Sequence, residues 1–128
     1  GFTRFWMTMG EAVSLVCHAA EHGAPGTVLI PALPAVRVED VAEAIAPKQA
    51  REMIGVRGIE KLHEVLFSDD EAPMIGRSVN AETGQEVFVF GQSFKGSERQ
   101  GYSSERAPKF SVNEIRRRLP QAMGEAEL

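Results

Sequence analysis

Helical periodicity between residues 38 and 46 constrains the fold of this chain more than any other pattern in it. Five apolar residues there follow the i, i+3, i+4, i+7, i+8 spacing that places side chains on one face of a helix. They are Val38, Val41, Ala42, Ile45 and Ala46. Pro47 cannot continue the helix, so its end is predicted there. The chain must supply another element on which this apolar face packs.

Two capping boxes predict where two more helices begin. Thr8 with Glu11, and Ser111 with Glu114, have the spacing in which a hydroxyl and a carboxylate each accept a free backbone N–H. The first of these helices is predicted to run to about His22. Its apolar face would consist of Ala12, Val13, Leu15, Val16, Ala19 and Ala20.

The ends of these two helices also have signals. Gly23 is expected to stop the first helix in a left-handed conformation. The second helix carries Val112, Ile115 and Leu119, and Pro120 is expected to end it. The main domain is therefore predicted to span residues 1–119, followed by a tail at 120–128 that frays.

Short runs rich in apolar and aromatic residues predict the strands. These runs span residues 2–7, 27–30, 52–56 and 85–90. Residues 62–67 fit either a helical turn or an extended segment, residues 80–84 a turn, and residues 94–106 a loop. Alternating strands and helices predict an α/β fold, namely a small sheet with flanking helices. Parallel strands in such a sheet are normally covered by helices on both faces. The helices are too few for two faces, which suggests that part of a larger protein is missing.

Composition narrows the class of protein. With 128 residues, 43% of them hydrophobic and 25% charged, the chain has enough apolar material for one globular core. Its net charge of −4 argues against a nucleic-acid or membrane partner. Cys17 is the only cysteine, which fits a reducing, cytoplasmic setting, and no stretch is long enough to span a membrane. The chain does not begin with methionine, so we expect a fragment.

The strongest candidate site is the stretch at residues 54–64, which brings an arginine, a glycine and an acid into one turn. Arg57 offers a planar fork of donors that suits phosphate oxygens, and Glu60 offers two acceptors that suit sugar hydroxyls. Gly58 would let the backbone pass close to a bulky partner. Arg4 is a charge inside an aromatic strand, so it needs an acidic partner or an anionic ligand. A compound with phosphate and ribose groups would satisfy Arg57 and Glu60 at once, and the alternative is that this stretch is a solvated turn.

Other polar residues have simpler interpretations. Tyr102 is followed four positions later by Arg106 rather than by lysine, so we interpret it as a surface or packing residue. Cys17 is expected to be buried, and His63 to form a local hydrogen bond.

Three clusters of charged or metal-ligating residues are interpreted in the same way. The histidine pair at positions 18 and 22 has no third metal ligand in view. The acids at positions 69–71 are expected to be solvated, and the arginines at 116–118 to complement a helix end. No glycine-rich dinucleotide fingerprint or P-loop is present in the sequence.

Several segments together resemble a known family. The segments are T-R-F-W-M-T-x-x-E-A-V at the start, P-x-x-x-V-x-D-V-A-E-A-I-A-P, G-V-R-x-x-E-K-L-H-E-V-L-x-S-D-D-E-A, and Y-S-S near the end. They are similar to the C-terminal part of bacterial polysaccharide-biosynthesis proteins, the UDP-N-acetylglucosamine 4,6-dehydratases and 4-epimerases of the extended short-chain dehydrogenase/reductase class. The resemblance implies the substrate-side portion of that fold without its Rossmann half.

The same resemblance implies roles for three residues. Arg4 and Arg57 would contact the diphosphate of a UDP-sugar, and Glu60 its ribose. The family's proline and glycine after the second arginine are replaced here by Gly58 and Ile59. In the family, NAD(P) binds to the other half, so no cofactor and no catalytic or metal residue is expected in this chain.

The predicted function is therefore UDP-sugar binding by a chain that is inactive alone. Its partners would be a second copy of itself or a Rossmann-containing chain. The alternative is a stand-alone interaction or regulatory module that associates with a separate cofactor-binding chain.

Overall fold

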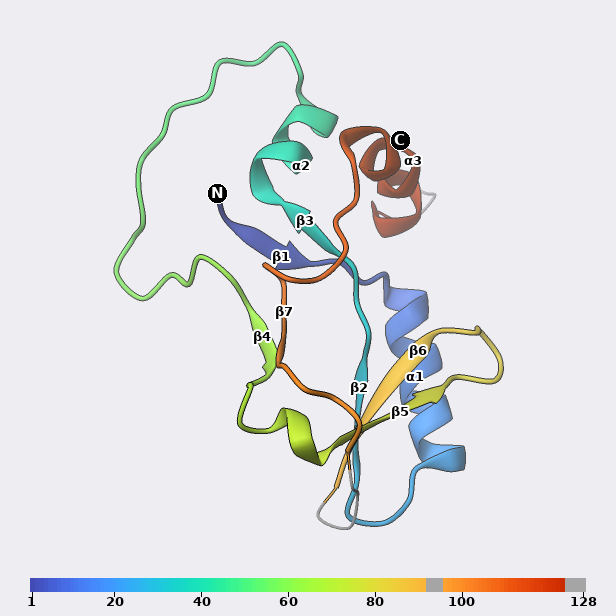
Figure 1. Ribbon diagram of the computed structural model, residues 1–128. Helices are drawn as coiled ribbons and strands as arrows, with labels where there is room; N and C mark the ends of the chain where they lie inside the picture. The colour runs from blue at the N-terminus through green and yellow to red at the C-terminus, as the bar shows by residue number, and fades with distance from the viewer. Residues whose placement is uncertain (92–95, 124–128) are drawn as a thin grey trace. The chain divides into compact units, whose positions relative to one another are not determined.

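Two compact regions make up the computed structural model of the chain, which describes residues 1–91 and 96–123 (Figure 1). Region 1 comprises Gly1–Trp6, Pro34–Glu64 and Ser104–Leu128. Region 2 comprises Met7–Leu33 and Val65–Ser103. Each region is described by itself.

Region 1 is built on one antiparallel pair of strands. Strand β1 (Thr3–Phe5) pairs with β3 (Ala35–Arg37), with Arg4 opposite Val36. Helix α2 (Val38–Ile45) begins directly after β3, and α3 (Val112–Met123) lies beside α2 (Figure 1). The core of this region consists of Val36, Ala44 and Ile115, against which Trp6, Val41, Phe110, Val112 and Leu119 pack.

The helices of region 1 test the sequence signals. Helix α2 is confirmed within one residue, and Ser111 and Glu114 form the predicted reciprocal cap of α3. The prediction that Pro120 ends α3 is wrong, because the helix continues to Met123. The proline removes a single N–H in the last turns, while Ile115 and Leu119 hold the preceding turns on the core. The tail at 124–128 lies outside the described residues.

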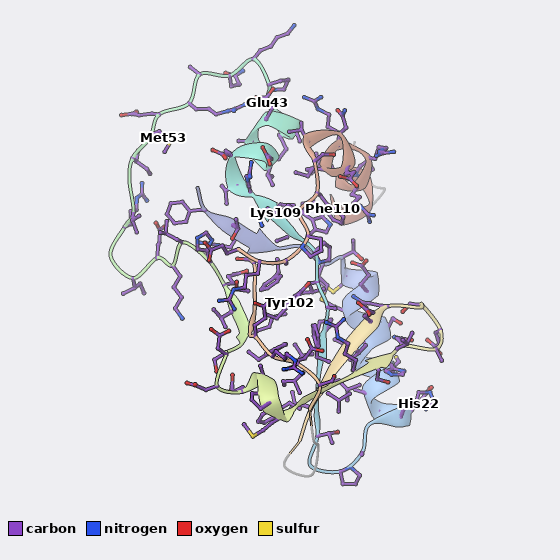
Figure 2. All side chains as sticks on the ribbon, in the orientation of Figure 1. His22, Glu43, Met53, Tyr102, Lys109 and Phe110 are labelled. Atoms are coloured by element: carbon purple, nitrogen blue, oxygen red, sulfur yellow. The ribbon has the colours of Figure 1, made fainter. Side chains whose placement is uncertain are left out.

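Region 2 contains a three-stranded sheet in the order β2-β6-β5. Its strands are β2 (Val28–Pro31), β5 (Ile75–Val79) and β6 (Glu86–Phe90). Strand β4 (Val65–Phe67) pairs with β7 (Tyr102–Ser103), and a short 3₁₀ helix, η1, spans Ala72–Met74. The core consists of Phe67, Ala72, Ile75 and Phe88. The ring of Tyr102 packs on this core, and its hydroxyl donates to the carbonyl of Leu33 at 2.8 Å (Figure 2).

The strand arrangement corrects the expected parallel sheet. All pairs between the described strands are antiparallel, and one of them, β5 with β6, is joined by the close turn at residues 80–84. Residues 85–90 are confirmed as a strand, and in the segment at residues 62–67 the extended alternative is confirmed for Val65–Phe67, which form β4. Pro31 closes β2, an edge strand where a missing N–H is tolerated. The loop prediction at 94–106 is wrong at β7, and its residues 94 and 95 lie outside the described residues.

Helix α1 (Met9–His22) in region 2 begins and ends as predicted, with the Thr8–Glu11 capping box in place. Its Gly23 has φ −67°, so the predicted left-handed stop is wrong. Glycine is needed there because a Cβ would collide with the carbonyl oxygen of Ala19. His18 is buried on this helix, whereas Cys17, predicted to be buried, is exposed. The predicted apolar face is divided, because Ala12, Leu15 and Ala19 are half-buried whereas Val13, Val16 and Ala20 are exposed. Ser14 accepts a hydrogen bond from the fully buried Asn80.

The stretch at residues 47–62 of region 1 is exposed at every position, and Figure 1 shows it as a long loop after α2. Its apolar residues at 52–56 were predicted to form a strand, but no described strand pairs with them. Met53 is 94% exposed (Figure 2). Among the described residues, no helix has the length and apolar character needed to cross a bilayer.

Candidate functional site

Arg4 lies in the middle of β1 and is half-buried, as expected for a charged residue in an aromatic strand. Its Nη1 donates to the carbonyl of Thr3 at 2.7 Å and to the carbonyl of Leu62 at 3.3 Å. Its Nε lies 3.8 Å from Glu64 Oε1, and its guanidinium carbon lies 5.5 Å from the centre of the Phe2 ring. These contacts fix one side of the guanidinium.

The contacts of Arg4 are unevenly distributed over its guanidinium. No hydrogen bond described for the guanidinium uses Nη2. Glu64 is also shared, because its Oε2 accepts the backbone N–H of Phe5 at 3.0 Å. The acidic partner that the sequence called for is therefore present, but most of the close contacts to Arg4 come from neutral carbonyls. Such carbonyls orient an arginine without cancelling its charge.

A set of buried hydroxyls anchors the segment that supplies these acceptors. Thr3 Oγ1 lies 2.8 Å from His63 Nδ1 and 2.6 Å from Ser104 Oγ. The N–H of Glu64 donates to Ser104 Oγ at 2.9 Å, and the N–H of Ser104 donates to the carbonyl of Glu64 at 2.8 Å. The N–H of Thr3 donates to the carbonyl of Leu62 at 3.0 Å. Residues 62–64 are thus fastened to β1. The predicted local hydrogen bond of His63 is wrong in its partner, because His63 bonds with Thr3, which lies 60 positions away in the sequence.

Arg57 and Glu60 form a small closed turn in the exposed 47–62 stretch. The N–H of Arg57 donates to Glu60 Oε2 at 3.0 Å, and the N–H of Glu60 donates to the carbonyl of Arg57 at 2.9 Å. Gly58 has φ +44°, and no atom lies within 4 Å of where its Cβ would be. Glycine is therefore required by the left-handed backbone, not by a close neighbour within this chain. The Arg57 guanidinium has no partner among the described residues.

The three predicted site residues belong to the same region, but none contacts another except Arg57 and Glu60. Leu62 links them through the chain, because it follows the turn and accepts from Arg4. The two cavities described lie elsewhere. One of about 390 Å³ in region 1 is lined by Phe2, Val38, Met53 and neighbouring residues, and one of about 440 Å³ in region 2 by His18, His22 and Arg77 among others.

The other polar candidates take structural roles. Tyr102 is a packing residue, and burial raises the pKa of its hydroxyl. Arg116 donates to the carbonyls of Glu43 and Ala44, so it caps the end of α2 instead of its own helix. The predicted complement to the α3 dipole is wrong, since arginines 116–118 lie in mid-helix.

Two further clusters can be placed. Asp69 accepts the N–H of Gly101 at 2.6 Å, so the acids at 69–71 do not form a purely solvated run. Within residues 1–91 and 96–123, no three His, Cys, Asp or Glu side chains are close enough to hold a metal.

Region 2 contains a strongly paired arginine. Arg77 on β5 donates through Nε and Nη2 to Glu98 at 2.5 and 3.0 Å, and through Nη1 to Glu86 at 3.3 Å. Hydrogen bonding from Arg77 lowers the pKa of Glu98, and the same contact raises the pKa of Arg77. This arginine is neutralised by protein carboxylates.

The first two thirds of the chain are similar to a known protein family. Residues 1–85 match the model of the polysaccharide biosynthesis protein family, which is two thirds of the chain. This chain belongs to that family. The resemblance found in the sequence motifs is confirmed.

Individual relatives support the assignment. The UDP-N-acetylglucosamine 4,6-dehydratase (inverting) of Campylobacter jejuni is 37% identical over 70 residues, which are 55% of this chain and 21% of that protein. The UDP-glucose 4-epimerase of Rickettsia felis is 30% identical over 133 aligned residues, covering 91% of this chain and 38% of that protein. The chain thus spans 21–38% of the length of these relatives.

A solved structure shares the fold. The X-ray structure of Pen from Bacillus thuringiensis superposes on 93% of this chain with a TM-score of 0.75, at 22% sequence identity. The match uses 37% of that chain. At this identity the likeness shows the fold alone.

Residues that matter to the geometry but carried no signal as site residues are Thr3, Leu62 and Ser104. Ser104 meets Thr3 across 101 positions of sequence, so no local spacing could have joined them. Leu62 acts through its carbonyl, which any residue type would supply.

Proposed function

We propose that this chain supplies the nucleotide-sugar-binding surface of a polysaccharide-biosynthesis dehydratase or epimerase. Arg4 and Arg57 would contact the diphosphate of a UDP-N-acetylglucosamine-type sugar, and Glu60 its ribose. The observation that carries the proposal is the state of Arg4, whose guanidinium is fixed on one side by carbonyls and has no described hydrogen bond on Nη2. Because the guanidinium is already held in place, it loses little conformational entropy when an anion binds.

The relatives' names support the class of ligand. Two are a UDP-N-acetylglucosamine dehydratase and a UDP-glucose epimerase, and their shared ligand chemistry is a uridine diphosphate. Arg57 lies on an exposed loop with no protein partner among the described residues, so it is free to reach a second phosphate oxygen. Glu60 would have to exchange its hydrogen bond with the Arg57 N–H for one with a sugar hydroxyl.

NAD(P) is the cofactor that we expect for the whole protein, but the residues of this chain do not fit it. The described strand pairs are antiparallel, and the sequence has no glycine-rich turn between a strand and a helix. We therefore assign no step of oxidation or dehydration to this chain. Binding of substrate is the function that we propose for it, and we expect no turnover by the chain alone.

Calorimetric titration tests the proposal. The chain should bind UDP and UDP-N-acetylglucosamine, whereas uridine, which has no phosphate, should bind much more weakly. Arg57→Ala should weaken UDP affinity by about 1.5–3 kcal/mol, which is the cost of a charge-assisted phosphate contact.

Arg117→Ala is the matched control, because it removes an equal charge from an exposed position of the same region. Equal losses in both variants would indicate a general charge effect and remove Arg57 from the site. No measurable affinity of the unmodified chain for UDP would contradict the proposal as a whole.

A second candidate function is association with a cofactor-binding chain, and the surface of α1 favours it. Met9, Val13 and Val16 are 79%, 56% and 68% exposed and follow helical spacing, with Cys17 and Ala20 exposed beside them. An apolar stripe of this kind is typical of a surface that another protein or a second copy covers. We expect self-association, which sedimentation at increasing concentration would detect. NAD-dependent turnover that appears only on mixing with a Rossmann-containing chain would favour the second candidate.

A further inference from the structure

We infer that the buried hydroxyl pair formed by Thr3 and Ser104 is a positioning device for Arg4, and that His63 sets the direction of its hydrogen bonds. None of these residues would touch the nucleotide sugar. They would act by fixing the carbonyls and the carboxylate that hold the Arg4 guanidinium. The inference rests on the proposed function only for its effect on affinity, because the order of Arg4 itself can be measured without a ligand.

Ser104 hydrogen-bonds to two of the residues that orient Arg4, Thr3 and Glu64. Its Oγ lies 2.6 Å from Thr3 Oγ1, accepts from the Glu64 N–H at 2.9 Å, and donates to the Thr3 carbonyl at 3.2 Å. That same Thr3 carbonyl accepts from Arg4 Nη1 at 2.7 Å. Glu64 supplies the carboxylate 3.8 Å from Arg4 Nε. The Ser104 hydroxyl therefore hydrogen-bonds to both Thr3 and Glu64, which contact Arg4 through a carbonyl and a carboxylate.

The donors and acceptors in this cluster can be satisfied in one direction. The Glu64 N–H donates to Ser104 Oγ, and the Ser104 O–H donates to the Thr3 carbonyl. The Thr3 O–H then donates to Ser104 Oγ at 2.6 Å, and His63 donates its Nδ1–H to Thr3 Oγ1 at 2.8 Å. His63 Nε2 lies 3.8 Å from Glu105 Oε1. By donating to the Thr3 hydroxyl oxygen, His63 directs the Thr3 O–H toward Ser104.

Burial makes these hydrogen bonds hard to replace. Thr3 is 4% exposed and Ser104 is fully buried, so water cannot readily take the place of a lost hydroxyl. If one of these hydroxyls is removed, residues 62–64 lose a hydrogen-bonded connection to β1. The Leu62 carbonyl and the Glu64 carboxylate would then be less well ordered. Arg4 would then have to be ordered by the ligand, which lowers affinity although every phosphate-contacting side chain is still present.

The first experiment needs no ligand. NMR relaxation of the Arg4 Nε–Hε group should show a restricted side chain in the unmodified protein. Thr3→Val removes the hydroxyl while keeping the branched shape, and it should give a mobile Arg4. Thr3→Ser keeps the hydroxyl and should restore the restriction. Thr27→Val is the matched control, since Thr27 bonds the Ala24 carbonyl in region 2 and its loss should leave Arg4 unchanged.

The second experiment measures UDP affinity by titration. Thr3→Val should weaken binding by about three- to tenfold, the cost of ordering one long side chain. In an Arg4→Ala background the same substitution should have no further effect, whereas a purely structural loss would persist there. If Thr3→Val does not fold, Ser104→Ala and His63→Asn carry the same test.

The outcomes separate the two proposals. Arg4 that stays equally restricted in Thr3→Val, Ser104→Ala and His63→Asn would overturn the inference, whatever the affinity for UDP. Arg4 that becomes mobile while the unmodified chain shows no affinity for UDP would support the positioning device and contradict the proposed function.

Discussion

Arg4 in region 1 and Arg77 in region 2 lie near similar groups but are held in opposite ways. Each guanidinium lies over a phenylalanine ring, at 5.5 Å from Phe2 and 5.2 Å from Phe88. Arg77 donates to two glutamates at 2.5–3.3 Å, whereas the hydrogen bonds of Arg4 go to two backbone carbonyls. The charge of Arg77 is compensated by carboxylates of its own region, whereas the carbonyls that hold Arg4 orient it without compensating its charge.

The largest expected difference is in the free energy of unfolding when the phenylalanine next to each arginine is replaced by alanine. Phe88 is 2% exposed and belongs to the core of region 2, so Phe88→Ala should lower the free energy of unfolding by about 3–5 kcal/mol. Phe2 is only half-buried, and Phe2→Ala should cost much less. Urea denaturation of both variants measures the difference. Similar losses would show that the two arginine environments are structurally equivalent.

Removing each arginine should have opposite consequences for UDP binding. Arg4→Ala should weaken affinity by about 1.5–3 kcal/mol, because a charge-assisted phosphate contact is lost. Arg77→Ala removes an equal charge and should leave affinity unchanged, while it leaves Glu98 without its main partner. Calorimetric titration of both variants measures the change in UDP affinity. A larger loss of affinity in Arg77→Ala than in Arg4→Ala would contradict the different roles proposed for the two arginines.

The two capping boxes should be equivalent, in contrast to the two arginines. Thr8→Ala in region 2 and Ser111→Ala in region 1 each remove a hydroxyl that accepts a helix N–H at 3.3 Å. Each should lower the free energy of unfolding by about 1 kcal/mol. Thermal unfolding would detect this as a small fall in Tm for both. No change in one of them would mean that its helix is held by packing alone.

Acid should weaken the Arg77 cluster by a small amount. The folded pKa of Glu98 is lowered by its hydrogen bond with Arg77, so its contribution is present at neutral pH and is lost as pH falls below about 4. Arg77 is half exposed, so the loss should be about 1 kcal/mol or less. Glu98→Gln should flatten the decline of stability between pH 5 and 3. An unchanged slope would show that other carboxylates dominate acid unfolding.

Local signals in the sequence were sufficient for the helices. Both capping boxes and the apolar spacing at residues 38–46 act within one or two turns, so the starts of α1, α2 and α3 could be predicted. Strands depend on distant partners instead. Residues 52–56 have the composition of a strand but pair with none of the described strands, whereas the two residues of β7 have little local signal but pair with β4.

The candidate site likewise has a part that could be predicted from local sequence and a part that could not. Arg4 and the Arg57–Glu60 turn could be found from residue type and spacing, because a charge in an aromatic strand and a glycine turn are visible locally. The support of Arg4 could not be found, since it uses the backbone of Thr3 and Leu62 and a serine 101 positions from Thr3. Contacts through carbonyls and across long sequence distances have no pattern in a single sequence.

The exposed 47–62 stretch has one further consequence. It contains Lys48, Arg51, Arg57 and Lys61 on backbone that no described strand protects, so trypsin should cut the folded chain there first. The two pieces would stay together, because Thr3 is bonded to Leu62, and Ala35 to Pro108 and Phe110, across the break. A bound anion that occupied Arg57 would shield the peptide bond after it, so the pattern of nicking would act as a footprint of the ligand.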